Sequence, residues 1–151
     1  MDPRSWKRIL VPTDFSDPSS EAMTTAMAFA QLSGATLDLV HVAVEATFAL
    51  PPPIDVATMP IDMTKMMERV TDGLRAEEKR VSATGLRCET AVLIGRPDAE
   101  IVARATATGA ELIVMGTHGR SGLAHALLGS VAERVVQHSP CPVLIVPKRP
   151  A

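Results

Sequence analysis

The chain has 151 residues, of which 46% are hydrophobic and 21% charged, and its formal net charge is −2 at pH 7. This composition is typical of ordinary globular proteins and excludes the disordered and fibrous classes. The small net charge gives no reason to expect nucleic acid or an anionic membrane surface as a partner. The length predicts a single domain, residues 1–151, that can bury a core without disulfide bonds.

The amino-terminal segment, MDPRSWKRILVPTD, contains only a short apolar run before Pro12 and Thr13. This run is too short for a secretory signal or a membrane span, so we expect a cytoplasmic protein that does not associate with membranes. The two cysteines, Cys88 and Cys141, lie in strand-like runs without metal-binding spacing. We therefore expect them to be small buried hydrophobic residues.

Five short runs rich in valine, isoleucine and leucine predict five β-strands. The first, fourth and fifth runs are almost continuously apolar, as in strands covered on both faces, whereas the second and third alternate and should be more exposed on one face. The predicted strands are residues 8–12, 36–42, 87–94, 111–115 and 142–146.

Four helical patterns lie between these strands. The first helix should have Asp17 as its N-cap, with Pro18 in the first position. The second carries an apolar stripe that we expect to be buried. That stripe consists of Met63, Met66, Met67, Val70, Leu74 and Val81. The third helix should begin at Pro97 and the fourth near Gly129. The four helices are expected to end at Gly34, Gly85, Gly109 and Pro140.

Strands that alternate with helices predict an α/β fold with a parallel sheet and helices on both faces. No repeat of the unit is visible. A proline-rich segment at residues 44–62 interrupts the alternation, and its three consecutive prolines exclude a helix there. We interpret it as a surface loop, with a lid over a ligand or a docking arm using Phe48 and Leu50 as the alternatives.

Glycines follow the predicted fourth strand at a regular spacing: Gly116, Gly119 and Gly129, with Ser130 next to the last. Ligands of open parallel sheets bind beyond the carboxyl ends of the strands, where the strand order reverses. Gly116 and Gly119 would allow positive φ and close approach of a ligand, and Gly129 and Ser130 would present free N–H groups at a helix start. The spacing therefore predicts a phosphate site, and a purely structural connection is the alternative.

Two other phosphate-binding patterns are absent from the sequence. No Gly-Lys-Ser or Gly-Lys-Thr occurs, which excludes a P-loop, and PTDFSD replaces the dinucleotide glycine motif after the first strand. His118 and Arg120 lie within the glycine-rich segment, where they either contact phosphate or are solvated loop residues. His41 lies inside a predicted strand, and we assign it a structural role.

Several segments resemble the universal stress protein family over essentially the whole chain: VPTDFS, IGRPDAEIV, ELIVMGTHGRSGLAHALLGSVAERV and HSPCPVLIV. Family members that bind ATP carry a G-x2-G-x9-G-[ST] motif, which matches the glycines above and Ser130. The resemblance implies ATP as ligand. We expect Mg²⁺ to accompany the phosphates without dedicated protein carboxylates, as is usual for that ion. The resemblance also implies a Rossmann-like, adenine nucleotide alpha hydrolase-like sheet of order 3-2-1-4-5, and a homodimer joined through the last strand, residues 142–147.

In the ATP-binding members the motif holds ribose and phosphates. By matching position, Pro12, Asp14 and Val42 would lie along the adenosine. Asp14 has an alternative role, which is to end the first strand and bond the loop backbone. The candidate nucleotide-binding residues are Pro12, Thr13, Asp14, Val42, Met115, Gly116, His118, Gly119, Arg120, Gly129, Ser130 and Val131.

The function that follows is an ATP-binding stress or signalling module whose nucleotide state alters its dimer or its partners. We expect slow or no hydrolysis, because the motif contains no positioned general base and no lysine or arginine finger. The alternative is a dimeric interaction protein of the same family that binds no nucleotide. A phosphoacceptor receiver domain fits poorly, because the third strand ends in Ile94, Gly95 and Arg96 instead of an aspartate.

Overall fold

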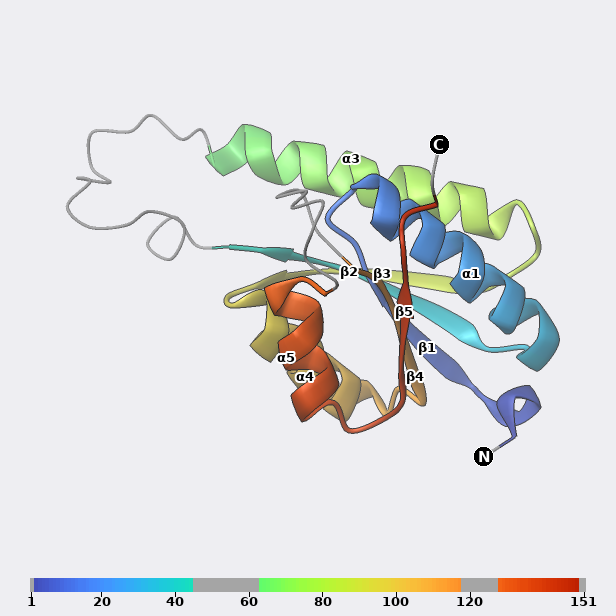
Figure 1. Ribbon diagram of the computed structural model, residues 1–151. Helices are drawn as coiled ribbons and strands as arrows, with labels where there is room; N and C mark the ends of the chain where they lie inside the picture. The colour runs from blue at the N-terminus through green and yellow to red at the C-terminus, as the bar shows by residue number, and fades with distance from the viewer. Residues whose placement is uncertain (1, 45–62, 118–127, 150–151) are drawn as a thin grey trace.

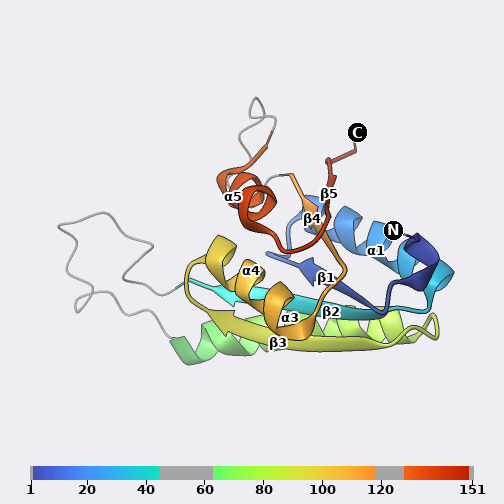
Figure 2. The same ribbon diagram turned by 90° about the horizontal axis from the view of Figure 1, so that it is seen from below.

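The computed structural model describes residues 2–44, 63–117 and 128–149. Its five strands form one parallel sheet of order β3-β2-β1-β4-β5, which confirms the expected α/β fold and strand order (Figures 1 and 2). The strands are β1 (Arg8–Pro12), β2 (Thr36–Ala43), β3 (Cys88–Ile94), β4 (Leu112–Gly116) and β5 (Val143–Val146).

Helices cover both faces of the sheet (Figure 1). Helices α1 (Asp17–Ser33) and α3 (Met63–Ser82) lie on one face, and α4 (Pro97–Thr108) and α5 (Ser130–His138) lie on the other. A short 3-10 helix, η1 (Pro3–Ser5), precedes β1. No helix in the described part of the chain is both long enough and apolar enough to cross a membrane.

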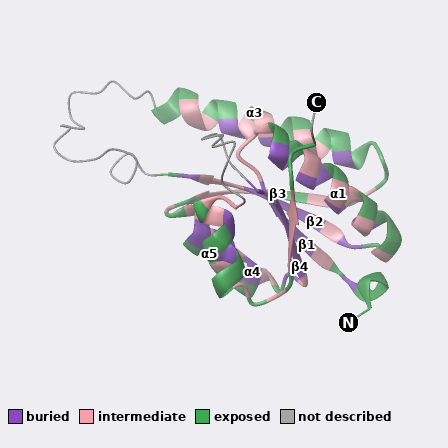
Figure 3. Cartoon of the chain, in the orientation of Figure 1, coloured by how far each residue is buried: buried purple, intermediate pink, exposed green. Residues whose placement is uncertain are grey.

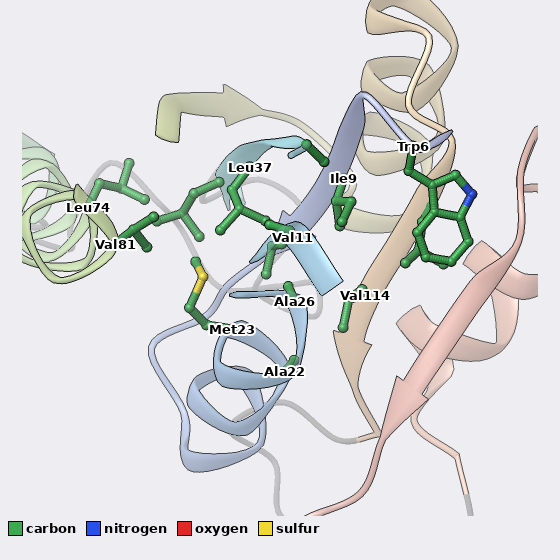
Figure 4. Close-up of a cluster of buried hydrophobic side chains, with 14 of the residues drawn as sticks. Trp6, Ile9, Val11, Ala22, Met23, Ala26, Leu37, Leu74, Val81 and Val114 are labelled. Carbon is green, nitrogen blue, oxygen red and sulfur yellow. The ribbon is translucent and has the colours of Figure 1, made fainter. Parts of the chain in front are cut away.

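Each face of the sheet has its own hydrophobic core. On the α1 and α3 face, Met23, Leu74 and Val81 belong to the same buried cluster as Val11 and Leu37 of the central strands (Figure 4). The buried residues accordingly gather on the sheet and on the inner sides of the helices (Figure 3). The core on the opposite face, under α4 and α5, is formed by Leu10, Val40, Ile101, Ala105, Ala110, Ile113, Met115, Ala132 and Val135.

The position of each strand in the sheet decides its burial. The expectation that β2 is more exposed on one face is wrong, because β2 lies between β1 and β3 and most of it is buried. Even its acidic residue, Asp38, is completely buried, and Arg104 of α4 compensates its charge through two hydrogen bonds of 2.9 Å. Strand β3 is an edge strand and is partly exposed, as expected. Strand β5 is only half-buried, because it forms the other edge.

Helix α1 begins one residue earlier than the sequence pattern suggests. Ser16, and not Asp17, is the N-cap, because its extended backbone lets its hydroxyl accept the N–H of Ser19 at 3.4 Å. Asp17 is the first helical residue, where its negative charge interacts favourably with the helix dipole. The other end is as expected, with Gly34 in the left-handed conformation at φ 75°.

The apolar stripe of α3 is buried only in its later turns. Val70, Leu74 and Val81 are buried, whereas Met63 is 47% exposed. Met66 and Met67 are half-buried. The prediction of a continuous buried stripe is therefore wrong for the first turn and only partly right for the second.

Neither cysteine is fully buried, which corrects the expectation for both, and Cys141 precedes β5 instead of lying in it. Burial, with the nearby Glu78 and Asp38 carboxylates adding to it, raises the pKa of the Cys88 thiol to about 12. Burial also raises the pKa of the Cys141 thiol. Both residues are therefore protonated, weakly nucleophilic thiols at neutral pH.

Candidate nucleotide-binding site

A cavity of about 400 Å³ lies at the carboxyl ends of β1, β2 and β4. Strands β1 and β4 are neighbours in the sheet, but the chain leaves them toward opposite edges, so the cavity lies where the strand order reverses. Its volume is within the range of small-molecule sites.

Nine of the twelve candidate residues line this one cavity, although they come from four separate parts of the sequence. The remaining three, His118, Gly119 and Arg120, lie outside the described residues. The nine that line the cavity are Pro12, Thr13, Asp14, Val42, Met115, Gly116, Gly129, Ser130 and Val131.

Ten further residues line the cavity and were not among the candidates. A signal existed for several of them, because His41, Ala43 and Val44 flank Val42 at the end of β2, and Pro97 begins the helix after β3. No local sequence pattern points to Met66 and Val70 of α3 as lining residues, because their position depends on how α3 packs across the sheet. The complete set is Ser19, His41, Ala43, Val44, Met66, Val70, Pro97, Ile101, Thr117 and Ala132.

The loop between β1 and α1 holds the Asp14 side chain through two hydrogen bonds. The Asp14 Oδ1 atom accepts the backbone N–H of Ser16 at 3.0 Å and the hydroxyl of Ser19 at 2.7 Å. Burial acts to raise the pKa of Asp14, but these hydrogen bonds from Ser16 and Ser19 outweigh it, so the pKa is below its ordinary value. Asp14 is therefore ionised at neutral pH, and it both bonds its own loop and lines the cavity.

The lowered pKa of Asp14 predicts a pH-dependent contribution to stability. The folded-state pKa lies below the unfolded value near 3.8, so the carboxylate stabilises the fold above that value and this contribution is lost as the pH falls through the folded-state pKa. We expect Asp14→Asn to lower the free energy of unfolding by about 1 kcal/mol at pH 7, allowing for solvent screening. Urea unfolding at pH 7, 5 and 3 measures it, and a difference that does not shrink at low pH would contradict the assignment.

Phe15 adopts a backbone conformation that is rare for an aromatic residue. Its φ is 63°, a left-handed value that costs about 1–3 kcal/mol. Its N–H donates to the Thr13 Oγ1 atom at 3.0 Å, and its ring stacks on His41 with the centroids 5.1 Å apart. A Cβ atom on Gly73 of α3 would lie 2.7 Å from the Phe15 ring, so only glycine allows this packing.

His41 joins the ends of β1 and β2. Its Nδ1 atom lies 2.8 Å from the Thr13 carbonyl oxygen, and because a carbonyl only accepts, Nδ1 must be the donor. This hydrogen bond between neighbouring strands is the kind of structural role that we expected for His41. The same residue also lines the cavity, which the sequence did not suggest.

The motif glycines act differently from the expectation. Positive φ occurs at Gly34, Gly85, Gly95 and Gly109 among the described glycines, and not at Gly116 or Gly129. Gly116 is required by packing, because a Cβ there would lie 2.7 Å from the Cβ atom and 2.8 Å from the backbone carbonyl carbon of Pro18. The end of β4 thus approaches the start of α1 more closely than any other residue would allow.

Gly129 connects α5 to the end of β4. Its N–H donates to the Thr117 carbonyl at 2.7 Å, so it is not the free donor that we expected. Its φ of −68° and ψ of 157° are extended values that any residue can adopt. This hydrogen bond fixes the beginning of α5 directly beside the cavity.

The amino-terminal turn of α5 supplies the donors of the site. Ser130, Val131 and Ala132 all line the cavity, and their N–H groups have no partner within the helix because they belong to its first turn. Gly129, the N-cap residue, has no side chain that could cap this end of the helix. The helix dipole adds partial positive charge there, so the arrangement favours an anion. Within residues 2–44, 63–117 and 128–149, no group of three or more histidine, cysteine or acidic side chains could hold a metal ion.

Comparison with known proteins agrees with this geometry. The sequence profile of the universal stress protein family matches residues 5–147. The chain belongs to the universal stress protein family. Universal stress protein MJ0531 of Methanocaldococcus jannaschii is 38% identical over 143 residues, which cover 95% of this chain and 83% of that protein.

Solved structures of the family share the fold. The structure of MJ0577, a universal stress protein of the same archaeon, superposes with a TM-score of 0.84 and 31% identity, covering 97% of this chain and 99% of that one. A universal stress protein in complex with cAMP superposes with a TM-score of 0.70 and 27% identity, covering 96% and 99% of the two chains. Nucleotide binding thus occurs in a structural neighbour from the same family.

Proposed function

We propose that this universal stress protein binds ATP in the cavity and acts as a nucleotide-responsive stress or signalling module. One observation carries the proposal: the motif residues Gly116, Gly129 and Ser130 meet at a cavity that receives the amino terminus of α5, whose N-cap residue is a glycine. The cAMP complex of a related structure supports an adenine nucleotide as the ligand class.

Different parts of the cavity lining suit different parts of a nucleotide. The N–H groups of Ser130, Val131 and Ala132 suit the phosphates. Apolar residues such as Val42 and Ile101 suit a base, and the ionised Asp14 can accept a hydrogen bond from a ribose hydroxyl.

Mg²⁺ fits this site as a companion of the phosphates. Asp14, the one carboxylate among the described lining residues, is assigned to the ribose, so Mg²⁺ would be held by the phosphates and water without a dedicated protein carboxylate. When bound, the ion neutralises phosphate charge. The described lining contains no lysine or arginine, and the Oδ1 atom of Asp14 already accepts two hydrogen bonds, so we expect hydrolysis to be slow or absent.

Copurification tests the proposal directly. The protein is purified, denatured and extracted, and the released nucleotides are identified by chromatography and mass spectrometry. The nucleotide-free protein is then titrated with ATP, AMP and cAMP, each with and without Mg²⁺. A protein that carries no nucleotide and binds none of them would support the alternative, an interaction protein of the same family that works without nucleotide.

Replacing Gly129 with valine should remove nucleotide binding while the fold is retained. Valine can adopt the extended backbone of Gly129, but Gly129 lines the cavity directly before the donors of α5, so we expect the added bulk to crowd the ligand. We expect the Kd for ATP with Mg²⁺ to rise at least tenfold, which corresponds to about 1.4 kcal/mol. Calorimetry measures the affinity and circular dichroism the fold.

The matched control for Gly129→Val is Ala107→Val, because Ala107 is exposed on α4 and does not line the cavity. This control should bind like the wild type. Equal affinity in the two variants and the wild type would contradict the site assignment.

We also propose that the protein forms a homodimer through its last strand, residues 142–147. Strand β5 is an edge of the sheet and consists of four apolar residues. The Pro142 and Val146 carbonyls accept N–H groups from the β4 side, so the alternating residues Val143 and Ile145 direct their backbone groups to the free edge. Light scattering tests this: the dimer has twice the chain mass of 16.0 kDa.

A further inference from the structure

Two hydrogen bonds hold the backbone of Thr13 at the end of β1. The Thr13 N–H donates to the Val40 carbonyl at 2.8 Å, and the Thr13 carbonyl accepts the Nδ1–H of His41 at 2.8 Å. Both partners belong to β2, and one of them is a side chain. His41 therefore completes the attachment of the β1 end to its neighbour.

Phe15 is held by the same histidine. Its ring stacks on the imidazole of His41 with the ring planes 29° apart, and Gly73 lies close behind the ring. The left-handed backbone of Phe15 turns the chain between β1 and α1. A bulky residue keeps such a conformation only when its surroundings enforce it.

Asp14 lies between these two residues, and both of them contact His41. The Asp14 carboxylate itself accepts hydrogen bonds from the Ser16 N–H and the Ser19 hydroxyl. The orientation of the carboxylate thus depends on the backbone that His41 braces, on the N-cap Ser16 and on Ser19 of α1. Ser19 and His41 both line the cavity with Asp14.

We propose that His41 is a positioning residue for Asp14: through its hydrogen bond to the Thr13 carbonyl, it places the Asp14 carboxylate at the wall of the nucleotide cavity. The effect on ligand affinity rests on the proposed function, whereas the effect on the Asp14 side chain does not. The competing interpretation is a core histidine that contributes only to stability.

Two substitutions of similar size separate these interpretations. In His41→Asn, the amide nitrogen is attached one bond beyond Cγ, as Nδ1 is in histidine, so it can still donate to the Thr13 carbonyl. In His41→Leu, the side chain fills the space without a donor. Neither variant keeps the aromatic ring, so the pair isolates the hydrogen bond from the stacking on Phe15.

The first measurement is the Kd for ATP with Mg²⁺ by calorimetry. We expect His41→Leu to raise the Kd about threefold to tenfold, the change that corresponds to one hydrogen bond, and His41→Asn to stay within about twofold of the wild type. In an Asp14→Ala background, His41→Leu should have almost no further effect, because the group that it positions is gone. An equal loss in both backgrounds would overturn the proposal.

The second measurement needs no nucleotide. The Asp14 carboxyl carbon is followed by NMR during an acid titration of the wild type and both variants. We expect the titration midpoint of Asp14 to move upward in His41→Leu and to stay unchanged in His41→Asn. An unchanged midpoint in a folded His41→Leu protein would overturn the proposal, whatever the result of the nucleotide titration. If the wild type binds no nucleotide but the Asp14 midpoint still moves upward in His41→Leu, only the proposed function is contradicted.

Discussion

Replacing Arg104 with methionine is expected to lower the free energy of unfolding by about 3–5 kcal/mol, the usual effect of removing one partner from a buried ion pair. Asp38 is completely buried in β2, and both of its carboxylate oxygens accept hydrogen bonds from Arg104 at 2.9 Å. Arg8 lies farther away, at 3.8 Å, and forms its shorter contact, 2.7 Å, with Glu89. Without Arg104 the Asp38 charge would remain buried and poorly compensated, and urea denaturation measures the loss.

Two further variants test whether the loss of stability in Arg104→Met comes from the unpaired Asp38 charge. Arg80→Met removes an arginine from an exposed pair with Glu77 on α3, and this control should change stability by about 1 kcal/mol or less. The double variant Asp38→Leu with Arg104→Met removes both charges and should recover much of the lost stability, because no unpaired charge is left. A loss below about 1 kcal/mol in Arg104→Met would contradict the assigned role of this pair.

The second large effect is expected for Gly116→Ala, which should both destabilise the fold and abolish nucleotide binding. The added methyl group would lie 2.7 Å from the Pro18 Cβ and 2.8 Å from its backbone carbonyl carbon. Because Pro18 belongs to the first turn of α1, relief requires β4 and α1 to move apart. Overpacking of this kind costs about 1–3 kcal/mol, and the displaced strand end is also a wall of the cavity.

Thermal or urea unfolding measures the stability of Gly116→Ala, and calorimetry with ATP and Mg²⁺ measures its binding. Gly129→Val is the informative comparison, because it should lose binding without a comparable loss of stability. The two motif glycines would then be separated by their physical roles: close packing against α1 at Gly116 and access to the α5 terminus at Gly129. A Gly116→Ala protein as stable as the wild type would contradict the packing argument.

The location of the site could be predicted because each of its parts follows a strand or begins a helix that a local sequence pattern indicates. Parallel strands bring their carboxyl ends to one edge, so Thr13, Val42 and Gly116 had to lie near one another once the strands were recognised. The strand order itself came from the resemblance to the universal stress proteins. The glycine spacing and the start of α5 pointed to an anion site at the same place.

Most of the errors concern residues whose environment is set by distant parts of the chain. The alternating pattern of β2 suggested an exposed face, but Arg104 covers Asp38 from α4. The choice of Ser16 over Asp17 as the N-cap depends on the geometry of the loop that leads into α1. The free donor expected at Gly129 is instead paired with the Thr117 carbonyl.

The sequence by itself determined the alternation of strands and helices and the approximate element boundaries, because hydrophobic period, glycine and proline act over a few neighbouring residues. The glycine spacing pointed to Gly116, Gly129 and Ser130 at the cavity, and the family resemblance added residues such as Asp14 and Val42. Only the tertiary structure decided that His41 braces the loop carrying Asp14, that Gly73 accommodates the strained Phe15, and that Gly116 is needed by Pro18. These contacts join residues that packing alone brings together, so no local pattern encodes them.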